Sequence, residues 1–179
     1  MRIVSGKLKG RRITAPKKLP VRPTTDRAKE ALFNILNNRF SFKHLKVIDL
    51  FAGIGSISFE FASRGTEQIT AVDQNYQCIQ FLTKTAEKLD LHLNLIKANA
   101  FDFVTNNKLT ADIVFADPPY NIESEQFLSL IEEVLKATNE VGLCIIEHSK
   151  HTDLSAGLHY KETRNYGGSS FSFFSSQEF

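Results

Sequence analysis

The chain has 179 residues, 42% of them hydrophobic, which is enough for one compact domain with a buried core. No apolar run approaches the roughly 20 residues of a membrane-spanning helix, and the charged N-terminus lacks the apolar stretch of a secretory signal, so neither membrane insertion nor export is expected. The two cysteines, Cys78 and Cys144, lie in apolar surroundings at no metal-ligand spacing, which predicts reduced core residues in a cytoplasmic protein.

Positive charge is concentrated at the beginning of the chain. The first 30 residues hold ten of the 22 Lys and Arg but only two of the 20 acids, so their formal charge is +8 and that of the remainder is −6. Lys and Arg that displace phosphate counterions provide affinity for nucleic acid of any sequence. A solvated face that keeps the chain in solution is the alternative, and composition does not choose between them.

The basic segment is expected to form a small hairpin, in which Arg2–Ser5 pairs with Arg11–Thr14. A Pro- and Lys-rich stretch at residues 14–25 follows and blocks helix formation. It marks the only candidate boundary within a single domain, between an arm of residues 1–25 and a core of residues 26–179.

Beyond this boundary the sequence alternates between helical and strand patterns. Thr24, Thr25 or Asp26 can cap a helix whose apolar face contains Ala28, Leu32, Ile35 and Leu36. From residue 46 onward, apolar runs of strand length alternate with segments of helical period, a pattern typical of a parallel sheet covered by helices. The five expected strands are Lys46–Leu50, Gln68–Val72, Leu93–Lys97, Ile113–Ala116 and Gly142–Ile146. Helices are expected between the second and third strands, with an apolar face from Tyr76 to Leu89, and between the fourth and fifth, with one from Phe127 to Leu135.

The C-terminal segment differs from this alternation. Leu158–Tyr166 and Phe171–Ser175 flank Gly167-Gly168, which predicts an antiparallel hairpin at one edge of the sheet. The alternation within it favours core packing over RNA stacking for its phenylalanines. The expected fold class is therefore α/β: a Rossmann-like, mostly parallel, seven-stranded sheet with a C-terminal antiparallel hairpin, preceded by a small basic N-terminal hairpin and a helix.

A glycine-rich turn follows the first strand and leads into a helix ending at Arg64-Gly65. Gly53 and Gly55 let the backbone approach a ligand closely. Asp73 ends the second strand 18 residues beyond Gly55, where an acid can accept hydrogen bonds from both ribose hydroxyls of a nucleoside cofactor. This pattern alone fits NAD as well as S-adenosylmethionine.

Two residues in this turn favour the methyl donor. Ser58 replaces the third glycine of the dinucleotide pattern. Asp49 precedes the turn, where an anion would repel a pyrophosphate but suit the cationic amino acid end of S-adenosylmethionine.

The fourth strand delivers Asp117-Pro118-Pro119-Tyr120 to the carboxyl edge of the sheet, where open α/β folds hold their ligands. The prolines stiffen the loop and fix the direction of its carbonyl groups. If the Asp117 carboxylate and the Pro118 carbonyl accept both hydrogens of an exocyclic amine, the nitrogen can offer its lone pair to a methyl group while Tyr120 stacks on the base. A plain proline turn with a surface tyrosine is the structural alternative, which the preceding glycine turn and ribose acid disfavour.

This order of motifs resembles the amino-methyltransferases, and the whole chain is similar to the RsmD family of small-subunit ribosomal RNA guanine-N2 methyltransferases, which are class I S-adenosylmethionine-dependent enzymes. The likeness also includes the opening Arg2-Ile3-Val4-Ser5-Gly6, the segment from Arg22 through Asn34, and Tyr166-Gly167. It implies S-adenosylmethionine as the cofactor and 16S ribosomal RNA in an assembled or assembling 30S particle as the substrate. The protein is expected to be a monomer in the cytoplasm.

The resemblance also implies roles for individual residues. The expected catalytic residues are Asp117, Pro118, Pro119 and Tyr120. The expected cofactor contacts are Asp49, Phe51, Gly53, Gly55, Asp73, Asn99 and Ala100. The resemblance places Arg22, Thr24 and Arg27 among the expected RNA contacts, and the charge of the arm adds Arg2, Lys7, Lys9, Arg11 and Arg12. The family usually has Asp at the position of Asn99, and a neutral amide should be a weaker acceptor for the adenine amine.

Three alternatives remain beside this interpretation. A DNA or RNA adenine amino-methyltransferase shares the Asp-Pro-Pro-Tyr motif, although the DNA enzymes generally need a target-recognition domain that a chain of 179 residues lacks. Glutamine methyltransferases of release factors have Asn in place of Asp117. An RNA-binding assembly factor could keep the cofactor for structure alone. No metal is expected, since His148 and His151 lack a third ligand and are interpreted as solvated loop residues.

Overall fold

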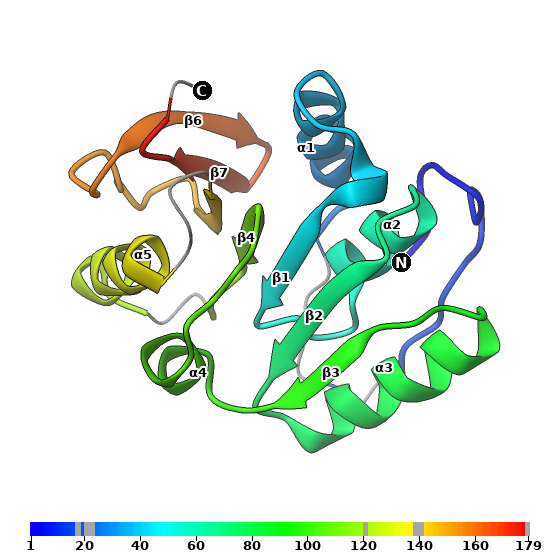
Figure 1. Ribbon diagram of the computed structural model, residues 1–179. Helices are drawn as coiled ribbons and strands as arrows, with labels where there is room; N and C mark the ends of the chain where they lie inside the picture. Colours follow the sequence, from blue (N-terminus) through cyan, green and yellow to red (C-terminus); the bar gives the residue numbers. More distant parts are fainter. Residues whose placement is uncertain (17–18, 20–23, 120–121, 138–141, 178–179) are drawn as a thin grey trace.

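The computed structural model describes the chain except for residues 17–18, 20–23, 120–121, 138–141 and 178–179 (Figure 1). The strands in these described residues are β1 Lys46–Leu50, β2 Gln68–Asp73, β3 Asn94–Lys97, β4 Ile113–Ala116, β5 Leu143–Ser149, β6 Tyr160–Tyr166 and β7 Ser169–Phe174. The helices are α1 Asp26–Asn37, the short 3₁₀ helix η1 Phe42–His44, α2 Ser56–Ser63, α3 Tyr76–Lys88, α4 Ala100–Asn106 and α5 Ser124–Ala137.

The strands form a seven-stranded sheet in the order β3-β2-β1-β4-β5-β7-β6. The first five strands pair in parallel, and β7 pairs antiparallel with both β5 and β6. The expected α/β fold with a C-terminal antiparallel hairpin is therefore confirmed. In Figure 1, this hairpin lies on the far side of β4 from β2 and β3.

Two packed layers cover the sheet. One cluster joins apolar residues of α1, α2 and α3 to β4 through Ile113 and Phe115, and the other joins α4 and α5 to β4 through Val114 and Ala116. This alternation follows from the two-residue period of a strand. Phe171, Phe173 and Phe174 are all fully buried, as the alternation in the hairpin predicted.

The fifth strand is longer than expected, because β7 pairs with it through Ser149. The interpretation of His148 as a solvated loop residue was wrong: it is buried in β5, with Nδ1 2.8 Å from the Ser149 carbonyl oxygen and Nε2 2.7 Å from Ser172 Oγ. The carbonyl can only accept, so Nδ1 carries the proton and Nε2 accepts from Ser172. His151 is exposed.

The start of the chain forms a less regular hairpin than expected. A single bridge joins Arg2 to Arg12, supported by the hydrogen bond from Ile3 N to the Arg11 carbonyl at 2.9 Å. Among the three candidate caps for α1, Thr25 has this role, since its side chain accepts from Ala28 N at 3.2 Å. The helices η1 and α4 were not predicted from the sequence.

Candidate active site

The turn between β1 and α2 folds back over the end of β2. Ala52 N donates to the Val72 carbonyl at 2.9 Å, and Gly53 N donates to Asp73 Oδ2 at 2.8 Å. Gly55 has φ +76°, and a Cβ there would lie 2.4 Å from Leu82 Cδ2. Glycine is therefore required at this position both by the backbone conformation and by the packing of α3.

Asp73 connects this turn to the start of α3. Its Oδ2 accepts from Gly53 N and its Oδ1 accepts from Asn75 N, each at 2.8 Å. Each carboxylate oxygen has a second lone pair, so the half-buried Asp73 can still accept from two hydroxyl groups. This geometry is compatible with the expected contact to a ribose.

Asp49 lies under the same turn and is almost completely buried. Its Oδ2 accepts from Ser58 N at 3.0 Å and from Ser58 Oγ at 2.5 Å. Burial raises the pKa of Asp49 to about 7; the bonds from Ser58 oppose this shift, and the nearby Asp73 and Glu147 carboxylates add to it. A cation placed beside Asp49 would favour its ionised form.

A cavity of about 340 Å³ lies over these residues at the carboxyl edge of the sheet, a size typical of small-molecule sites. It brings together expected residues from five separate parts of the chain. Those that line it are Thr24, Asp49, Phe51, Gly53, Asp73, Ala100, Asp117, Pro118 and Pro119. The glycine turn and the reaction centre therefore share one pocket.

The remaining expected site residues lie elsewhere. Asn99 is exposed, and its Oδ1 accepts from Phe101 N at 2.9 Å and Asp102 N at 3.3 Å, so the amide oxygen caps α4. Its neighbour Ala100 lines the cavity, whereas Asn99 and Gly55 are not part of the described lining. Tyr120 and Arg22 lie outside the described residues.

Sequence reasoning missed two residues at this site. Asn75 lines the cavity and caps α3, since its Oδ1 accepts from Gln77 N at 2.8 Å. Its position before a helical pattern was a usable signal. Glu147 is buried at the end of β5 and accepts a hydrogen bond from Thr24 Oγ1 at 2.7 Å. No local pattern connects residues that are 123 positions apart.

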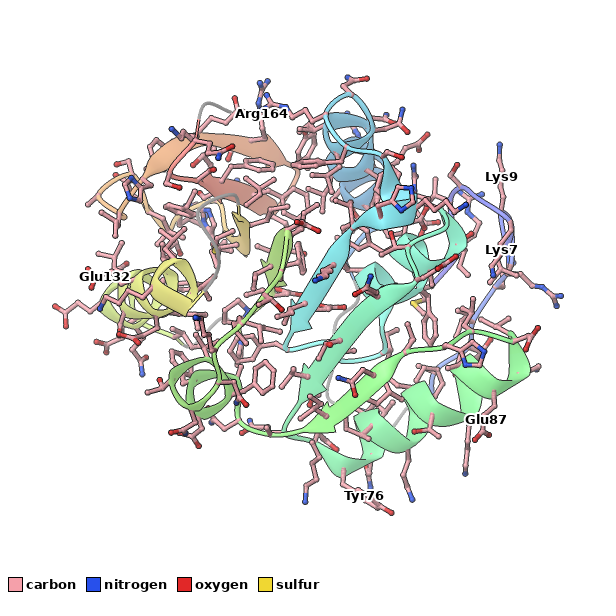
Figure 2. All side chains as sticks on the ribbon, in the orientation of Figure 1. Lys7, Lys9, Tyr76, Glu87, Glu132 and Arg164 are labelled. Atoms are coloured by element: carbon pink, nitrogen blue, oxygen red, sulfur yellow. The ribbon has the colours of Figure 1, made fainter. Side chains whose placement is uncertain are left out.

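The basic residues among the expected RNA contacts lie on the protein surface wherever the structure describes them. Lys7, Lys9, Arg11, Arg12 and Arg27 are exposed, and Figure 2 shows Lys7 and Lys9 pointing into solvent. Arg2 Nε lies 3.1 Å from Asp26 Oδ2 in an exposed ion pair. The hairpin turn rests on the end of α2, where Lys7 N donates to the Ser63 carbonyl at 2.7 Å.

The described residues contain neither a membrane-spanning helix nor a metal-binding cluster. Among the described residues, no helix is long and apolar enough to span a membrane. No group of three or more His, Cys, Asp or Glu side chains within the same residues is arranged to hold a metal ion.

Comparison with known proteins gives matches over nearly the whole chain. The family described as conserved hypothetical protein 95 matches residues 1–175. The chain is 32% identical over 160 residues to the putative rRNA methyltransferase YlbH of Bacillus subtilis, covering 86% of this chain and 85% of that protein. It is 31% identical over 143 residues to the ribosomal RNA small subunit methyltransferase D of Escherichia coli, covering 79% of this chain and 68% of that protein.

A solved structure of a hypothetical protein from Thermus thermophilus has a similar fold. The two superimpose with a TM-score of 0.84 at 26% sequence identity, over 98% of this chain and 99% of that one. The arrangement of the sheet and of both helical layers is therefore shared along the full length of the chain.

Proposed function

The chain belongs to the family of conserved hypothetical protein 95, the RsmD family, and on this premise we propose that it methylates the N2 amine of a guanine in 16S ribosomal RNA. S-adenosylmethionine is the methyl donor. The substrate is the assembled or assembling small subunit, and the enzyme acts in the cytoplasm as a monomer. The observation that carries this proposal is the common cavity of Asp73, Asp49 and the Asp117-Pro118 pair.

The described residues fit the cofactor at both of its ends. Asp73 has free lone pairs for the ribose hydroxyls, next to a backbone turn that a ligand can approach closely. Asp49 provides a buried carboxylate for the ammonium group of the methionine end. When bound, S-adenosylmethionine supplies a methyl group on a sulfonium, whose C–S bond breaks as the new C–N bond forms.

The reaction centre then has to hold the amine and accept the charge that develops on it. The Asp117 carboxylate and the Pro118 carbonyl accept the two amine hydrogens. The nitrogen can then pyramidalise and offer its lone pair to the methyl group instead of delocalising it into the purine ring. As nitrogen becomes positive, these acceptors stabilise it, and one proton leaves after the transfer, with Asp117 as its first acceptor. Tyr120 is proposed to stack on the base.

The decisive experiment compares methylated nucleotides in ribosomal RNA from cells with and without this protein, using mass mapping. We expect the loss of one N2-methylguanine from the small-subunit RNA, restored when purified protein and S-adenosylmethionine are added to the small subunits. Loss of a methyladenine instead would favour an adenine amino-methyltransferase. Identical maps would contradict the enzyme and favour an assembly factor.

A further inference from the structure

The sheet edge around the candidate cavity has two sides that differ in chemistry. On one side of β4 lie the ends of β1 and β2, with Gly53 and Asp73 at the proposed cofactor site. On the other side lies β5, whose end carries Glu147. Asp117 follows β4 and so stands between them, and because the β1 and β2 side is assigned to the cofactor, we place the acceptor base toward the β5 side.

Glu147 comes level with the reaction centre on the neighbouring strand. The parallel register pairs Phe115 with Ile145 and Ala116 with Ile146, so the next position on each strand is Asp117 and Glu147. Phe115 and Ile145 pack in the same core cluster, and residues two positions further along project from the same face of the sheet. Adjacent strands lie about 4.8 Å apart, so Glu147 stands beside Asp117 at this edge of the sheet.

Thr24 connects Glu147 to the cavity. Its Oγ1 donates to Glu147 Oε2 at 2.7 Å, and both side chains are buried, with exposed fractions of 7% and 2%. Thr24 also lines the cavity together with Asp117. A hydroxyl has one proton to donate, so with that proton held by Glu147 the Thr24 oxygen can only accept hydrogen bonds from a ligand.

We propose that Glu147 is a positioning residue that makes Thr24 an obligate hydrogen-bond acceptor for the ring N1–H of guanine, and thereby selects guanine over adenine. The inference rests on the function proposed above and deepens it. In guanine, N1–H and the N2 amine are adjacent donors on one edge, so acceptors at Thr24 and Asp117 match both. Adenine has a bare N1 lone pair, which would face the Thr24 oxygen without a proton between them.

The test compares guanosine with 2-aminopurine riboside at the methylated nucleotide of 16S RNA in reconstituted small subunits. The analogue keeps the exocyclic amine but has no proton on N1. We expect the wild-type protein to prefer guanosine in kcat/KM by about tenfold or more, the scale of one hydrogen bond lost with its acceptor left unpaired. Glu147→Gln provides an amide that can donate to Thr24, which leaves the Thr24 hydroxyl proton free to bind the ligand. Thr24→Val removes the hydroxyl altogether. In both variants, the ratio of kcat/KM for guanosine to that for the analogue should be close to one.

Three further measurements separate this role from a structural one. Thr24→Ser keeps the hydroxyl and should retain the preference for guanosine. Thr66→Val is the matched control, since Thr66 is also buried and donates one hydrogen bond, to the Phe42 carbonyl at 2.9 Å, far from the pocket. Thr66→Val should leave the ratio of kcat/KM for guanosine to that for 2-aminopurine riboside unchanged. Its melting temperature should fall about as much as that of Thr24→Val. The dissociation constant for S-adenosylmethionine should change by no more than about twofold in the Glu147 and Thr24 variants. This is a smaller change than the loss of one hydrogen bond to the cofactor would cause.

An unchanged ratio in Glu147→Gln and Thr24→Val, with the wild type active on guanosine, would overturn the inference and leave the proposed function intact. Weaker binding of S-adenosylmethionine with an unchanged ratio would also overturn it, and would assign Thr24 to the cofactor. A wild type that methylates neither RNA would remove the proposed function, and with it the inference.

Discussion

At the scale of single residues, the acids around the cavity have different environments and therefore different chemistry. Asp49 is buried and held by Ser58, Asp73 accepts from two backbone amides at the rim, and Glu147 accepts from Thr24. Asp117 directly follows β4, the strand between β1 and β5, and lines the same cavity. This separation allows one acid to attract a cation while another contacts the amine.

Replacing Asp117 should impair the transfer step while leaving the cofactor bound. In Asp117→Ala we expect turnover to fall by roughly 100-fold or more, the scale of losing one positioned transition-state partner. Binding of S-adenosylmethionine, measured by titration calorimetry, should change little. Asp112→Ala is the matched control, because Asp112 precedes the same strand and accepts from Lys46 N at 2.7 Å, away from the cavity. Normal turnover in Asp117→Ala would exclude this residue from the mechanism.

The raised pKa of Asp49 predicts a pH dependence of cofactor binding. With a pKa of about 7, the carboxyl is mostly protonated at pH 6 and mostly ionised at pH 8. Affinity for the cationic methionine end should therefore rise with pH, and the dissociation constant at pH 6 should be up to about tenfold that at pH 8. Calorimetric titrations at both values measure it. Asp49→Asn should bind S-adenosylmethionine more weakly, and its affinity should not depend on pH. The same pH dependence in this variant as in the wild type would refute the assignment of the titration to Asp49.

The same shift affects the protein without cofactor. The folded state keeps the Asp49 proton up to about pH 7, whereas an ordinary carboxyl has lost it near the unperturbed value of 3.8. Since the folded state then binds more protons than the unfolded state, this group lowers the free energy of unfolding as pH rises through that window. Burial of Asp49 at the proposed cofactor site therefore lowers the stability of the folded protein at neutral pH.

Asp49, Asp73 and Asp117 could be predicted from the sequence because each follows or ends a recognisable strand, and parallel strands bring their carboxyl ends to one edge. The Thr24–Glu147 pair could not, because its partners come from distant segments that meet only in the folded chain. The position of the Asn99 side chain could not be predicted either. The motif assigns this side chain to a ligand, but in the structure it caps α4.

At the scale of secondary structure elements, a buried charge cluster joins α1, α2 and the N-terminal hairpin. Glu60 of α2 lies 3.6 Å from Lys29 Nζ of α1 and 3.0 Å from Arg64 Nε. The Glu60 carboxylate also accepts from Val4 N at 2.8 Å and Ser5 N at 3.0 Å. Burial lowers the pKa of Lys29, and Glu60 opposes that shift. The hairpin is thus attached to the helix that begins at the glycine turn.

Removing Glu60 should loosen this attachment. Glu60→Ala leaves the Lys29 ammonium buried without its partner and two backbone amides without an acceptor, which we expect to cost about 3–5 kcal/mol in the free energy of unfolding. Urea denaturation measures the loss in the free energy of unfolding. Faster hydrogen exchange at the Val4 and Ser5 amides would show that the hairpin has loosened. Glu132→Ala removes an exposed partner of Lys136 and should change stability little, so equal effects in both variants would contradict the role of the buried cluster.

The five parallel strands and the terminal hairpin were predicted because their apolar patterns are local. The end of β5 was not predicted, because pairing with β7 extends this strand through Ser149 and buries His148. Such pairing depends on a segment that is distant in the sequence. Helix α4 was missed because seven residues carry too short a pattern to be distinguished from a loop.

At the scale of the whole molecule, the N-terminal hairpin lies along α2. Glu60 holds Val4 and Ser5 beside the middle of this helix, and Ser63 holds Lys7 beside its end. The glycine turn lies at the beginning of the same helix. RNA that places one base in the cavity can therefore extend along the outer face of the hairpin, where its phosphates meet exposed cations.

This arrangement predicts the salt dependence of substrate binding. Four exposed cations of the hairpin are to be replaced by Gln: Lys7, Lys9, Arg11 and Arg12. If each neutralises one phosphate of a single strand, the slope of log affinity against log salt should become shallower by about 3. The control replaces four exposed lysines outside the hairpin, Lys43, Lys84, Lys88 and Lys108, and so removes the same charge. Filter binding of small-subunit RNA at several salt concentrations should separate the two variants, because only bound phosphates release counterions. Equal slopes would show that the hairpin acts through overall charge alone, as a solvated face.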